Sequence, residues 1–349
     1  MPVSFTQHYL GKRVEQRLAD FLETWRAPVS DPDVQAAYRL LTEFILGGGK
    51  RIRPLLCYWG WRGAGGDDCD EIVSAAAALE LCHAGLLIHD DIMDGSELRR
   101  GRATIHRNLA DLHAGPAAES FGHAGGILLG TLSLAWSDTL LSSCGVEPVR
   151  LRAAHHIFDA MRTEVISGQY LDILAQLRAG ASVTEALTVI RYKTAKYTVE
   201  RPLQIGGALA GAQPELLDAF SRFGVPLGEA FQLRDDVLGT FGSAAETGKS
   251  ALDDLREGKH TVLIAHAVAH ASPAQLDHLR AWHGNPRLTE EQAAGLRAIL
   301  IDTGALDQVE SMIDERVGEA RAALALAPIG PEAGSALSVL ADQLAHRTK

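Results

Sequence analysis

The sequence predicts an all-α fold, and two observations carry that prediction. Four long windows place apolar residues at i, i+3, i+4 and i+7 among Ala, Leu, Glu and Arg, as amphipathic helices do; the windows are residues 70–94, 151–177, 183–210 and 214–238. No window alternates apolar and polar residues for long, which is the pattern of a half-buried strand. Helices are therefore expected along nearly the whole chain, including its carboxy-terminal third.

The segments between these windows predict loops, because they mix Gly, Pro, Asp and Ser within a few residues. None of them has the length or composition of a linker between domains. With 349 residues, of which 46% are apolar, the chain can bury a large core. We expect one domain over residues 1–349, in which about 47–261 carry the motifs and about 262–349 form carboxy-terminal helices. The predicted loops are 47–49, 63–68, 95–115, 145–148, 180–182 and 243–248.

Charge and cysteine usage exclude several classes of protein. The formal net charge of −11 offers no broad basic surface for nucleic acid. The amino terminus lacks the pattern of a signal peptide, and the longest uncharged run, 120–137, predicts a buried helix rather than a transmembrane segment. Cys57, Cys69, Cys82 and Cys144 form no CxxC pair, so we expect reduced thiols and a cytoplasmic protein.

The first motif along the chain is GGGKRIRP, residues 47–54. Its glycines let the backbone turn tightly at a helix end, and Pro54 suits the first turn of the next helix. Lys50 and Arg53 add two cations near the amides of that helix start. Free helix amides and cations together favour an anion such as a phosphate.

The helix over 70–94 ends in a dense run of opposite charges, LLIHDDIMDGSELRR. Asp90 and Asp94 are i, i+4 neighbours whose carboxylates repel, the more so because the carboxy terminus of a helix already carries partial negative charge. A divalent cation relieves this repulsion, and Mg²⁺ is favoured because it combines one or two carboxylates with waters and substrate phosphates. A solvated acidic helix end is the alternative interpretation.

A second acidic motif, FQLRDDVLG, places Asp235 and Asp236 at the end of the helix over 214–238, one turn after Gln232. We expect the two acidic helix ends to face each other and to hold metal ions between them. Most of the chain's few lysines lie inside similar motif-like stretches, which indicates binding roles rather than surface roles. These lysines are Lys50, Lys193, Lys196, Lys249 and Lys259.

Taken in order, these stretches resemble those of a known family. The trans-isoprenyl diphosphate synthases, or polyprenyl synthetase family, carry motifs similar to GGGKRIRP, ELCHAGLLIHDDIMDGSELRRGRATIH, SGQYLDI, YKTAKYT, GEAFQLRDDVLGTFG and TGKSALDDLREGKHT. Within that family the chain most resembles geranylgeranyl diphosphate synthases. The resemblance implies the isoprenoid synthase fold, a single bundle of long, mostly antiparallel helices around a deep central cavity, and a homodimer.

The resemblance also implies a reaction. Such enzymes join isopentenyl diphosphate to an allylic diphosphate: the allylic C–O bond ionises, the isopentenyl double bond attacks the cation, and a proton passes to the departing diphosphate. About three Mg²⁺ ions are expected to stabilise that leaving group. By resemblance Asp90 and Asp94 bind two ions and Asp235 binds the third, while Asp91 and Asp236 complete the acidic motifs.

The cations are divided between the two diphosphates by the same resemblance. Isopentenyl diphosphate is expected to bind without metal, at Lys50, Arg53, His83 and Arg100. The allylic diphosphate is expected to contact Arg99, Lys193, Lys249 and Lys259. His83 lies two helical turns before Asp90, which directs both side chains to the same cleft.

Four further polar residues are expected around the reacting carbon. A carbocation needs a dry cavity with oxygen dipoles but no good nucleophile. By resemblance, Thr194 and Gln232 offer oxygen lone pairs there. Gln169 is expected to line the site, and Asp172 to orient a lysine or a metal-bound water.

The chain departs from the family at three positions. The second acidic motif often has a third aspartate at its fifth position, where this chain has Gly239. Loss of function is one interpretation; we favour the other, in which water replaces the missing ligand, because Mg²⁺ accepts water and the remaining motif residues are present. Lys196 and Tyr197 replace small or apolar residues, and the sequence assigns them no role.

Two other functions share parts of this pattern. A terpene cyclase would need the aspartates but not a second diphosphate pocket. The cationic residues predicted to form that pocket, which include Lys50 and His83, therefore argue against a cyclase. A non-catalytic subunit of a two-protein synthase usually lacks acidic ligands in the first motif, whereas all three aspartates are present here.

Product length is predicted from Leu86 and Gly85, four and five residues before Asp90. Bulky aromatic side chains at these positions stop chain growth in the family, by closing the product tunnel. Gly85 has no side chain, which favours geranylgeranyl diphosphate, with farnesyl or longer prenyl diphosphates as alternatives.

Overall fold

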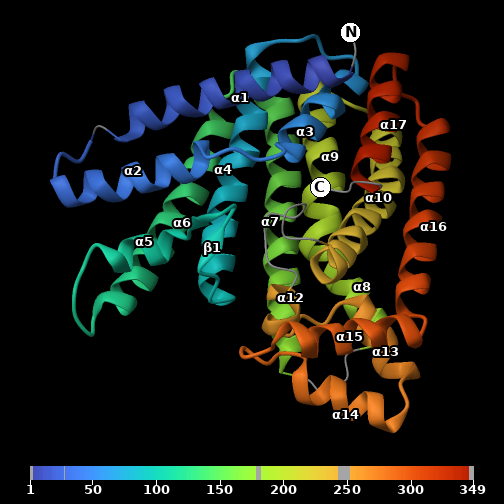
Figure 1. The fold of residues 1–349 in the computed structure, drawn as a ribbon. Coiled ribbons are helices and arrows are strands. Elements are labelled where there is room, and N and C mark those ends of the chain that lie inside the picture. The colour runs from blue at the N-terminus through green and yellow to red at the C-terminus, as the bar shows by residue number, and fades with distance from the viewer. Residues whose placement is uncertain (1–2, 27, 178–181, 243–251, 346–349) are drawn as a thin grey trace. The chain divides into compact units, whose positions relative to one another are not determined.

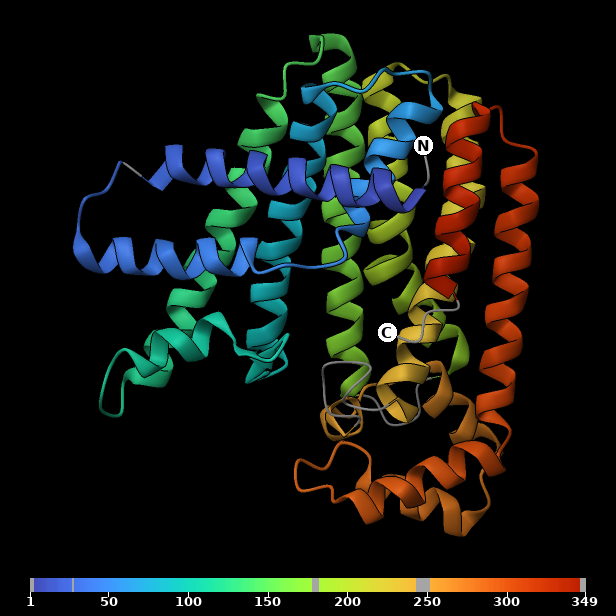
Figure 2. The ribbon, with the colours of Figure 1, turned by 45° about the horizontal axis from the view of Figure 1, so that its top comes forward.

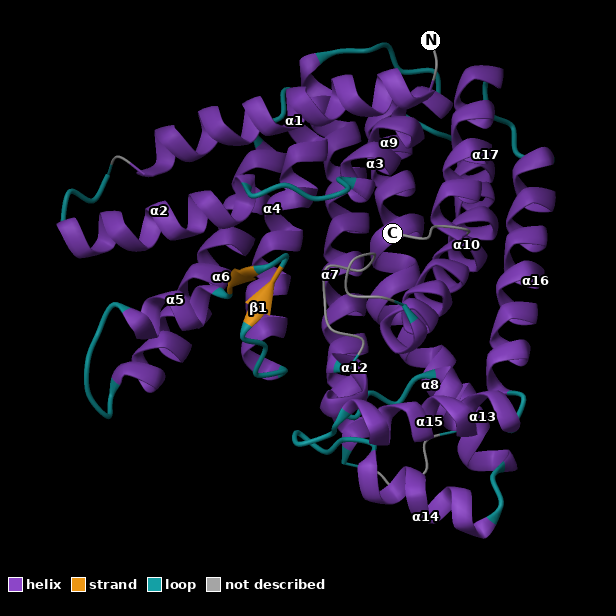
Figure 3. Cartoon of the chain, viewed as in Figure 1, coloured by secondary structure: helices purple, strands orange, loops and turns teal. Residues whose placement is uncertain are grey.

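A computed structural model of the chain describes residues 3–26, 28–177, 182–242 and 252–345. Helices form most of these residues, and the only described strands are the two-residue β1 (Leu98–Arg99) and β2 (Arg102–Ala103), which pair antiparallel (Figure 3). The all-α prediction is therefore confirmed. The helices group into two compact units, Met1–Ala154 with Ile205–Ala212, and His155–Gln204 with Gln213–Lys349. Each unit is described by itself, and the one-domain interpretation stays a prediction.

Unit 1 is built around one helix, α4. This helix packs against α1, α2, α3, α5 and α6 (Figure 1). It is apolar on nearly all sides from Ile72 to Ile88. α1 and α2 lie side by side in both views of the ribbon (Figure 2). The helices are α1 (Val3–Arg26), α2 (Pro32–Leu46), α3 (Ile52–Gly63), α4 (Asp70–Met93), α5 (Ile105–Asp111), α6 (Ala118–Ser142) and the start of α7 (Pro148–Gln176).

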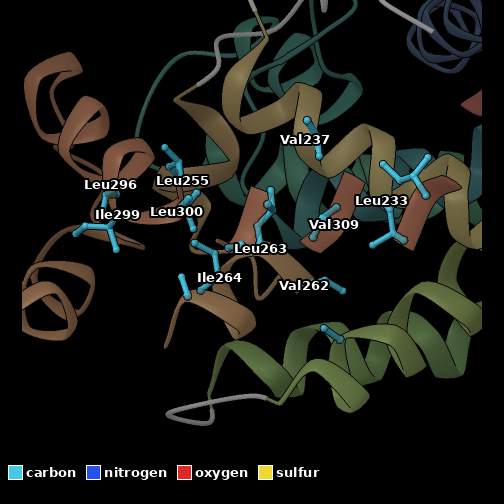
Figure 4. Close-up of a cluster of buried hydrophobic side chains, with 14 of the residues drawn as sticks. Leu233, Val237, Leu255, Val262, Leu263, Ile264, Leu296, Ile299, Leu300 and Val309 are labelled. Carbon is cyan, nitrogen blue, oxygen red and sulfur yellow. The ribbon is translucent and has the colours of Figure 1, made fainter. Parts of the chain in front are cut away.

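Unit 2 is built around α10, which packs against the π-helix η1 and against α16 and α17. Its apolar core joins Leu233 and Val237 of α10 to Leu263 of α13, Leu300 of α15 and Val309 of α16 (Figure 4). The elements are the rest of α7, α8 (Val183–Val189), η1 (Ile190–Glu200), the start of α9 (Arg201–Ala210, which belongs to unit 1 from Ile205 on), α10 (Pro214–Phe241), α12 (Asp253–Glu257), α13 (Val262–His270), α14 (Pro273–Trp282), α15 (Glu290–Asp302), α16 (Ala305–Ala325) and α17 (Pro331–Ala345).

Two predicted segments differ from the structure. The segment 95–115, predicted as a loop, contains the β1–β2 hairpin and the short helix α5. The window 183–210 is helical throughout, as predicted, but its centre, η1, is a π-helix. Such π-helical segments are rare in proteins as a whole. Those that occur often lie at functional sites.

Two helices, α4 and α6, are long and apolar enough to cross a membrane, judged by length and composition alone. The apolar stretch of α4 is 78% buried within the protein and that of α6 is 44% buried. Because core helices of soluble proteins meet the same criteria, this is weak evidence for a membrane span. α6 covers the run 120–137, which confirms the predicted helix, although one of its faces is exposed.

Candidate active site

The first acidic motif lies at the end of α4 in unit 1. Asp90 and Asp91 are in the last turn, and Asp94 follows, its backbone N–H donating to the carbonyl of Asp90 at 2.9 Å. Asp91 is 1% exposed, and its Oδ1 accepts from Nε and Nη2 of Arg99 at 2.6 and 2.5 Å. Arg99 therefore ties the hairpin to α4 through Asp91, while Asp90 and Asp94 remain partly exposed one helical turn apart.

The loop before α3 is anchored by Arg51, which the sequence did not single out. Arg51 has a left-handed backbone with φ of 49° and is buried. Its Nη1 lies 2.6 Å from Oε1 of Glu80 on α4, and its Nη2 donates to the carbonyl of Ile45 at 3.0 Å. This buried ion pair fixes the glycine loop against α4, so the two neighbouring cations are held close to that helix.

The four residues predicted to bind isopentenyl diphosphate all belong to unit 1. Arg53 lies in the first turn of α3, Lys50 is exposed just before that helix, and Arg100 follows β1. Arg100 donates from Nη1 to the carbonyl of Gly48, so the hairpin meets the glycine loop. The pKa of His83 lies well below the ordinary value, because burial lowers it and the positive charges of Arg53 and Arg100 lower it further. The positive charges of Arg53 and Arg100 thus act on the His83 side chain.

The carboxylates at the end of α4 fit Mg²⁺ by the chemistry of their donors. Oxygen is the donor that this cation prefers, and waters and phosphates complete its octahedral shell. Within the described ranges, no three His, Cys, Asp or Glu side chains are grouped closely enough to hold an ion by themselves. Asp90 and Asp94 thus suit an ion that also binds water and a phosphate.

In unit 2, predicted residues make three direct contacts. Nζ of Lys193, in η1, lies 2.6 Å from Oδ2 of Asp172 on α7, so Asp172 orients this lysine, as expected. Thr194 Oγ1 donates to Oε1 of Gln232 at 2.7 Å, and Nε2 of Gln232 donates to Oδ1 of Asp236 at 2.8 Å. This chain of hydrogen bonds fixes which end of the Gln232 amide faces each neighbour.

The second acidic motif lies near the end of α10. Asp235 is partly buried, and Asp236 is 9% exposed. Burial raises the pKa of Asp236 to about 7; the bond from Gln232 opposes this rise, and the negative charge of Asp254 adds to it. Asp236 is therefore in an environment that disfavours its charge unless a cation arrives.

The lysine that follows α12 contacts two carboxylates. Nζ of Lys259 lies 3.2 Å from Oδ1 of Asp254 and 2.8 Å from Oε2 of Glu257. Lys249, the other lysine predicted in this segment, lies outside the described residues. Whether the second acidic motif faces the first stays a prediction.

Comparison with known proteins decides the family. The profile of the polyprenyl synthetase family matches residues 34–300, which include every motif described above. The chain belongs to the polyprenyl synthetase family. It is accordingly a prenyltransferase, as its relatives are.

The relatives of this polyprenyl synthetase differ in product. A geranylfarnesyl diphosphate synthase of Aeropyrum pernix is 33% identical over 307 residues, covering 87% of this chain and 92% of that protein. An octaprenyl diphosphate synthase of Escherichia coli is 32% identical over 86% of each. A geranylgeranyl pyrophosphate synthase of Corynebacterium glutamicum, solved with isoprenyl diphosphate and magnesium, is 39% identical, with a TM-score of 0.93 over 97% of this chain and 98% of that one. The fold is therefore that of the isoprenoid synthases.

The position predicted to line the product tunnel is closed by packing. A β-carbon on Gly85 would lie 2.7 Å from the carbonyl oxygen of Gly130 and 2.9 Å from Cγ of Leu134, both on α6. Gly85 thus lies in the contact between α4 and α6, and its effect on product length stays a prediction. Leu86 is partly buried, and its effect on product length stays a prediction.

A close approach of two helices, missed from the sequence, positions Lys193 and Thr194. A β-carbon on Gly168 of α7 would overlap the backbone nitrogen of Lys193 and lie 2.7 Å from its Cα. Glycine is therefore required in α7 where it meets η1. Gln169, the next residue, is partly buried, and its role stays a prediction.

The two unexplained residues of η1 have structural partners. Nζ of Lys196 lies 2.7 Å from Oε1 of Glu164 on α7, and Arg201 binds the same carboxylate through Nε and Nη2, both at 2.7 Å. Burial raises the pKa of Glu164, but the bonds from Arg201 and Lys196 outweigh it and leave the pKa below its ordinary value. Tyr197 is buried in the core. Lys196 therefore joins η1 to α7.

Proposed function

We propose that this chain condenses isopentenyl diphosphate with an allylic diphosphate in a Mg²⁺-dependent reaction, with geranylgeranyl diphosphate as the main product. One observation in unit 1 carries the proposal. Asp90 and Asp94 lie about two and three turns along from His83, and the positive charges of Arg53 and Arg100 act on the His83 side chain. We therefore assign carboxylates for a metal and cations for a metal-free diphosphate to successive turns of the same helix and the segments beside it.

The cationic site suits a diphosphate that must stay bonded to its carbon. Lys50, Arg53, His83 and Arg100 bind isopentenyl diphosphate through charge and hydrogen bonds, without a Lewis acid. Its C–O bond is therefore not activated, and its double bond remains free to attack.

The acidic site suits the diphosphate that must leave. Asp90 and Asp94 would hold Mg²⁺ against the allylic diphosphate, and the bound ion would supply positive charge to the leaving group. Asp91 acts through Arg99, whose guanidinium it orients towards the same end of α4. Asp235 is assigned to the third ion.

The residues of unit 2 complete the proposed chemistry. Lys193, oriented by Asp172, donates to a diphosphate oxygen. Thr194 gives its hydroxyl proton to Gln232, so its oxygen lone pairs are available to the allylic cation without a free nucleophile. The departing diphosphate accepts the proton lost after condensation, and no side-chain base is required.

Product length and assembly belong to the same proposal. The relative from C. glutamicum supports geranylgeranyl diphosphate, while the geranylfarnesyl and octaprenyl relatives make longer products the alternatives. A homodimer is supported by α6, which exposes Phe121, Ile127 and Leu128 at 46, 52 and 69%. Light scattering of the purified protein tests the dimer. We also propose a cytoplasmic location.

The deciding experiment incubates the purified protein with isopentenyl diphosphate, Mg²⁺ and dimethylallyl, geranyl or farnesyl diphosphate. Chromatography of the dephosphorylated products should show mainly geranylgeraniol, and a chelator should abolish its formation. Farnesol or longer alcohols would overturn the product assignment while keeping the reaction. Diphosphate release without incorporation of isopentenyl units would indicate a terpene cyclase, and no turnover would indicate a non-catalytic subunit.

A further inference from the structure

One face of α7 contacts η1 at three successive turns. Glu164, Gly168 and Asp172 follow one another at intervals of four residues, so they share a face of the helix. The carboxylate of Glu164 binds Nζ of Lys196, and that of Asp172 binds Nζ of Lys193. Between them, a β-carbon on Gly168 would overlap the backbone nitrogen of Lys193. The two helices therefore touch along the part of η1 that carries Lys193.

η1 also packs closely against α10. A β-carbon on Gly228 would overlap Cα of Ala195, and one on Gly224 would lie 2.8 Å from Cα of Glu200. Backbone packing against α7 and α10 thus restrains η1 sideways. Charged side chains bind at particular residues, so they fix which residue of η1 lies opposite which residue of α7.

Glu164 makes the larger number of these charged contacts. Its Oε1 lies 2.7 Å from Nζ of Lys196, and Arg201, the first residue of α9, binds both of its oxygens through Nε and Nη2 at 2.7 Å. Charge-assisted bonds of this kind are strong, and the planar fork of arginine also fixes their geometry. Glu164 therefore holds the end of η1 at two points.

We propose that Glu164 is a positioning residue for prenyl transfer, which holds the end of η1 through Lys196 and Arg201 and so places Lys193 against the diphosphate. This inference rests on the proposed function, in which Lys193 donates to a diphosphate oxygen. It gives Lys196, which departs from the family pattern, a role in the reaction without contact with the substrate.

The π-helical form of η1 makes such a contact necessary. Its backbone hydrogen bonds follow an i→i+5 pattern, which is rare and is normally confined to single turns. The Asp172–Lys193 and Glu164–Arg201 pairs are eight residues apart in both segments, so together they fit one register of η1 against α7. A change of η1 to an ordinary α-helix would rotate Arg201 relative to Lys193, and the two pairs could not form together.

A role in stability alone predicts a different outcome. If Glu164 only stabilised the fold, its loss would lower the melting temperature and leave kcat unchanged in the folded variant. If Glu164 positions Lys193, kcat falls although the variant is folded, while KM for isopentenyl diphosphate stays the same. The two roles are therefore separated by steady-state kinetics below the melting temperature.

Three substitutions in the full chain, with one control, make the kinetic test. Glu164→Gln keeps the shape and removes the charge, and we expect kcat to fall about tenfold, because a misplacement of about 1 Å costs up to about a hundredfold. Glu164→Asp keeps the charge and should retain more of kcat. Lys196→Met removes one of the two partners and should lower kcat by a smaller factor. The control, Val317→Ala in the core of α16, should lower the melting temperature without changing kcat.

Calorimetric titration with Mg²⁺ and inorganic diphosphate shows whether the effect passes through Lys193. Glu164→Gln should weaken diphosphate binding in the chain that has Lys193. The same substitution should have no further effect in Lys193→Ala, because two changes that act through one group are not additive.

Three results overturn the inference. The first is a wild-type kcat in Glu164→Gln or, if that variant does not fold, in Lys196→Met. The second is an equal loss of kcat in Val317→Ala for the same fall in melting temperature. The third is equal weakening of diphosphate binding with and without Lys193. A wild type that transfers no prenyl groups in the same assay refutes the proposed function itself, whereas the three results above, obtained with an active wild type, refute only the role of Glu164.

Discussion

Replacing Gly168 by Ala tests how η1 is positioned. The added β-carbon would overlap the backbone nitrogen of Lys193 and lie 2.7 Å from its Cα and 2.8 Å from the carbonyl carbon of Tyr192. These are backbone atoms, so they cannot rotate away and η1 must shift. Overpacking costs up to about 3 kcal/mol, and the better helix propensity of Ala returns about 1 kcal/mol. We therefore expect Gly168→Ala to lower the free energy of unfolding by about 2 kcal/mol.

The same shift should impair turnover, because Lys193 and Thr194 move with η1. Misplacing a positioned group by about 1 Å costs up to about a hundredfold in rate. Steady-state kinetics and urea unfolding of the same preparation measure both effects. The control is Gly318→Ala in α16, where a β-carbon meets nothing within 4 Å. It should gain about 1 kcal/mol and leave kcat unchanged.

The comparison between the two glycine variants decides the outcome. If Gly168→Ala were as stable as Gly318→Ala and kept the wild-type kcat, the close approach of α7 to Lys193 would not position the site. If Gly168→Ala lost stability but kept the wild-type kcat, Gly168 would serve helix packing and would not position the site.

Three further predictions concern the charged residues. Asp90→Asn should lower turnover by several orders of magnitude at saturating Mg²⁺ without changing the melting temperature, and unchanged turnover would refute the metal assignment. Arg53→Ala should raise KM for isopentenyl diphosphate about tenfold or more with little change for the allylic substrate, because a charge-assisted hydrogen bond is lost; equal rises would contradict the division of substrates. When a chelator removes metal ions, Asp236 has a pKa of about 7 in the folded state, above its value of about 3.9 in the unfolded state. Between these two pH values the folded state binds more protons than the unfolded state, so the free energy of unfolding falls as pH rises. Asp236→Asn should flatten that fall in melting temperature from pH 5 to 8, and an unchanged slope would exclude Asp236 as its source.

The helices were predictable because their signals are local. α4 and its acidic end follow from apolar spacing and neighbouring charges, all within one window. The hairpin was not predictable, because β1 and β2 are too short to show a period. The buried bond between Arg99 and Asp91 ties this hairpin to α4, and no local pattern shows such a contact.

The site was predictable residue by residue, but its contacts across helices were not. Lys193 and Asp172 each stood in a readable motif, whereas Gly168 matters only because another helix lies close to it. Gly85 is a similar case: its spacing from Asp90 gives its helical turn, but no local pattern shows that α6 packs against it. Asp254 lay within a quoted motif, and only the structure shows that its carboxylate fills the space beside Gly239.

The contacts of the cations agree with the division of the two diphosphates. The three described residues assigned to the allylic diphosphate each pair with a carboxylate, in Arg99–Asp91, Lys193–Asp172 and Lys259–Asp254. By contrast, burial and then the positive charges of Arg53 and Arg100 together lower the pKa of His83 well below the ordinary value. A diphosphate that carries Mg²⁺ has lost much of its negative charge, so it suits a site where cations and carboxylates are balanced. A metal-free diphosphate keeps its full charge and suits the positive charges around His83, so on the proposed assignment we expect each site to favour its own substrate.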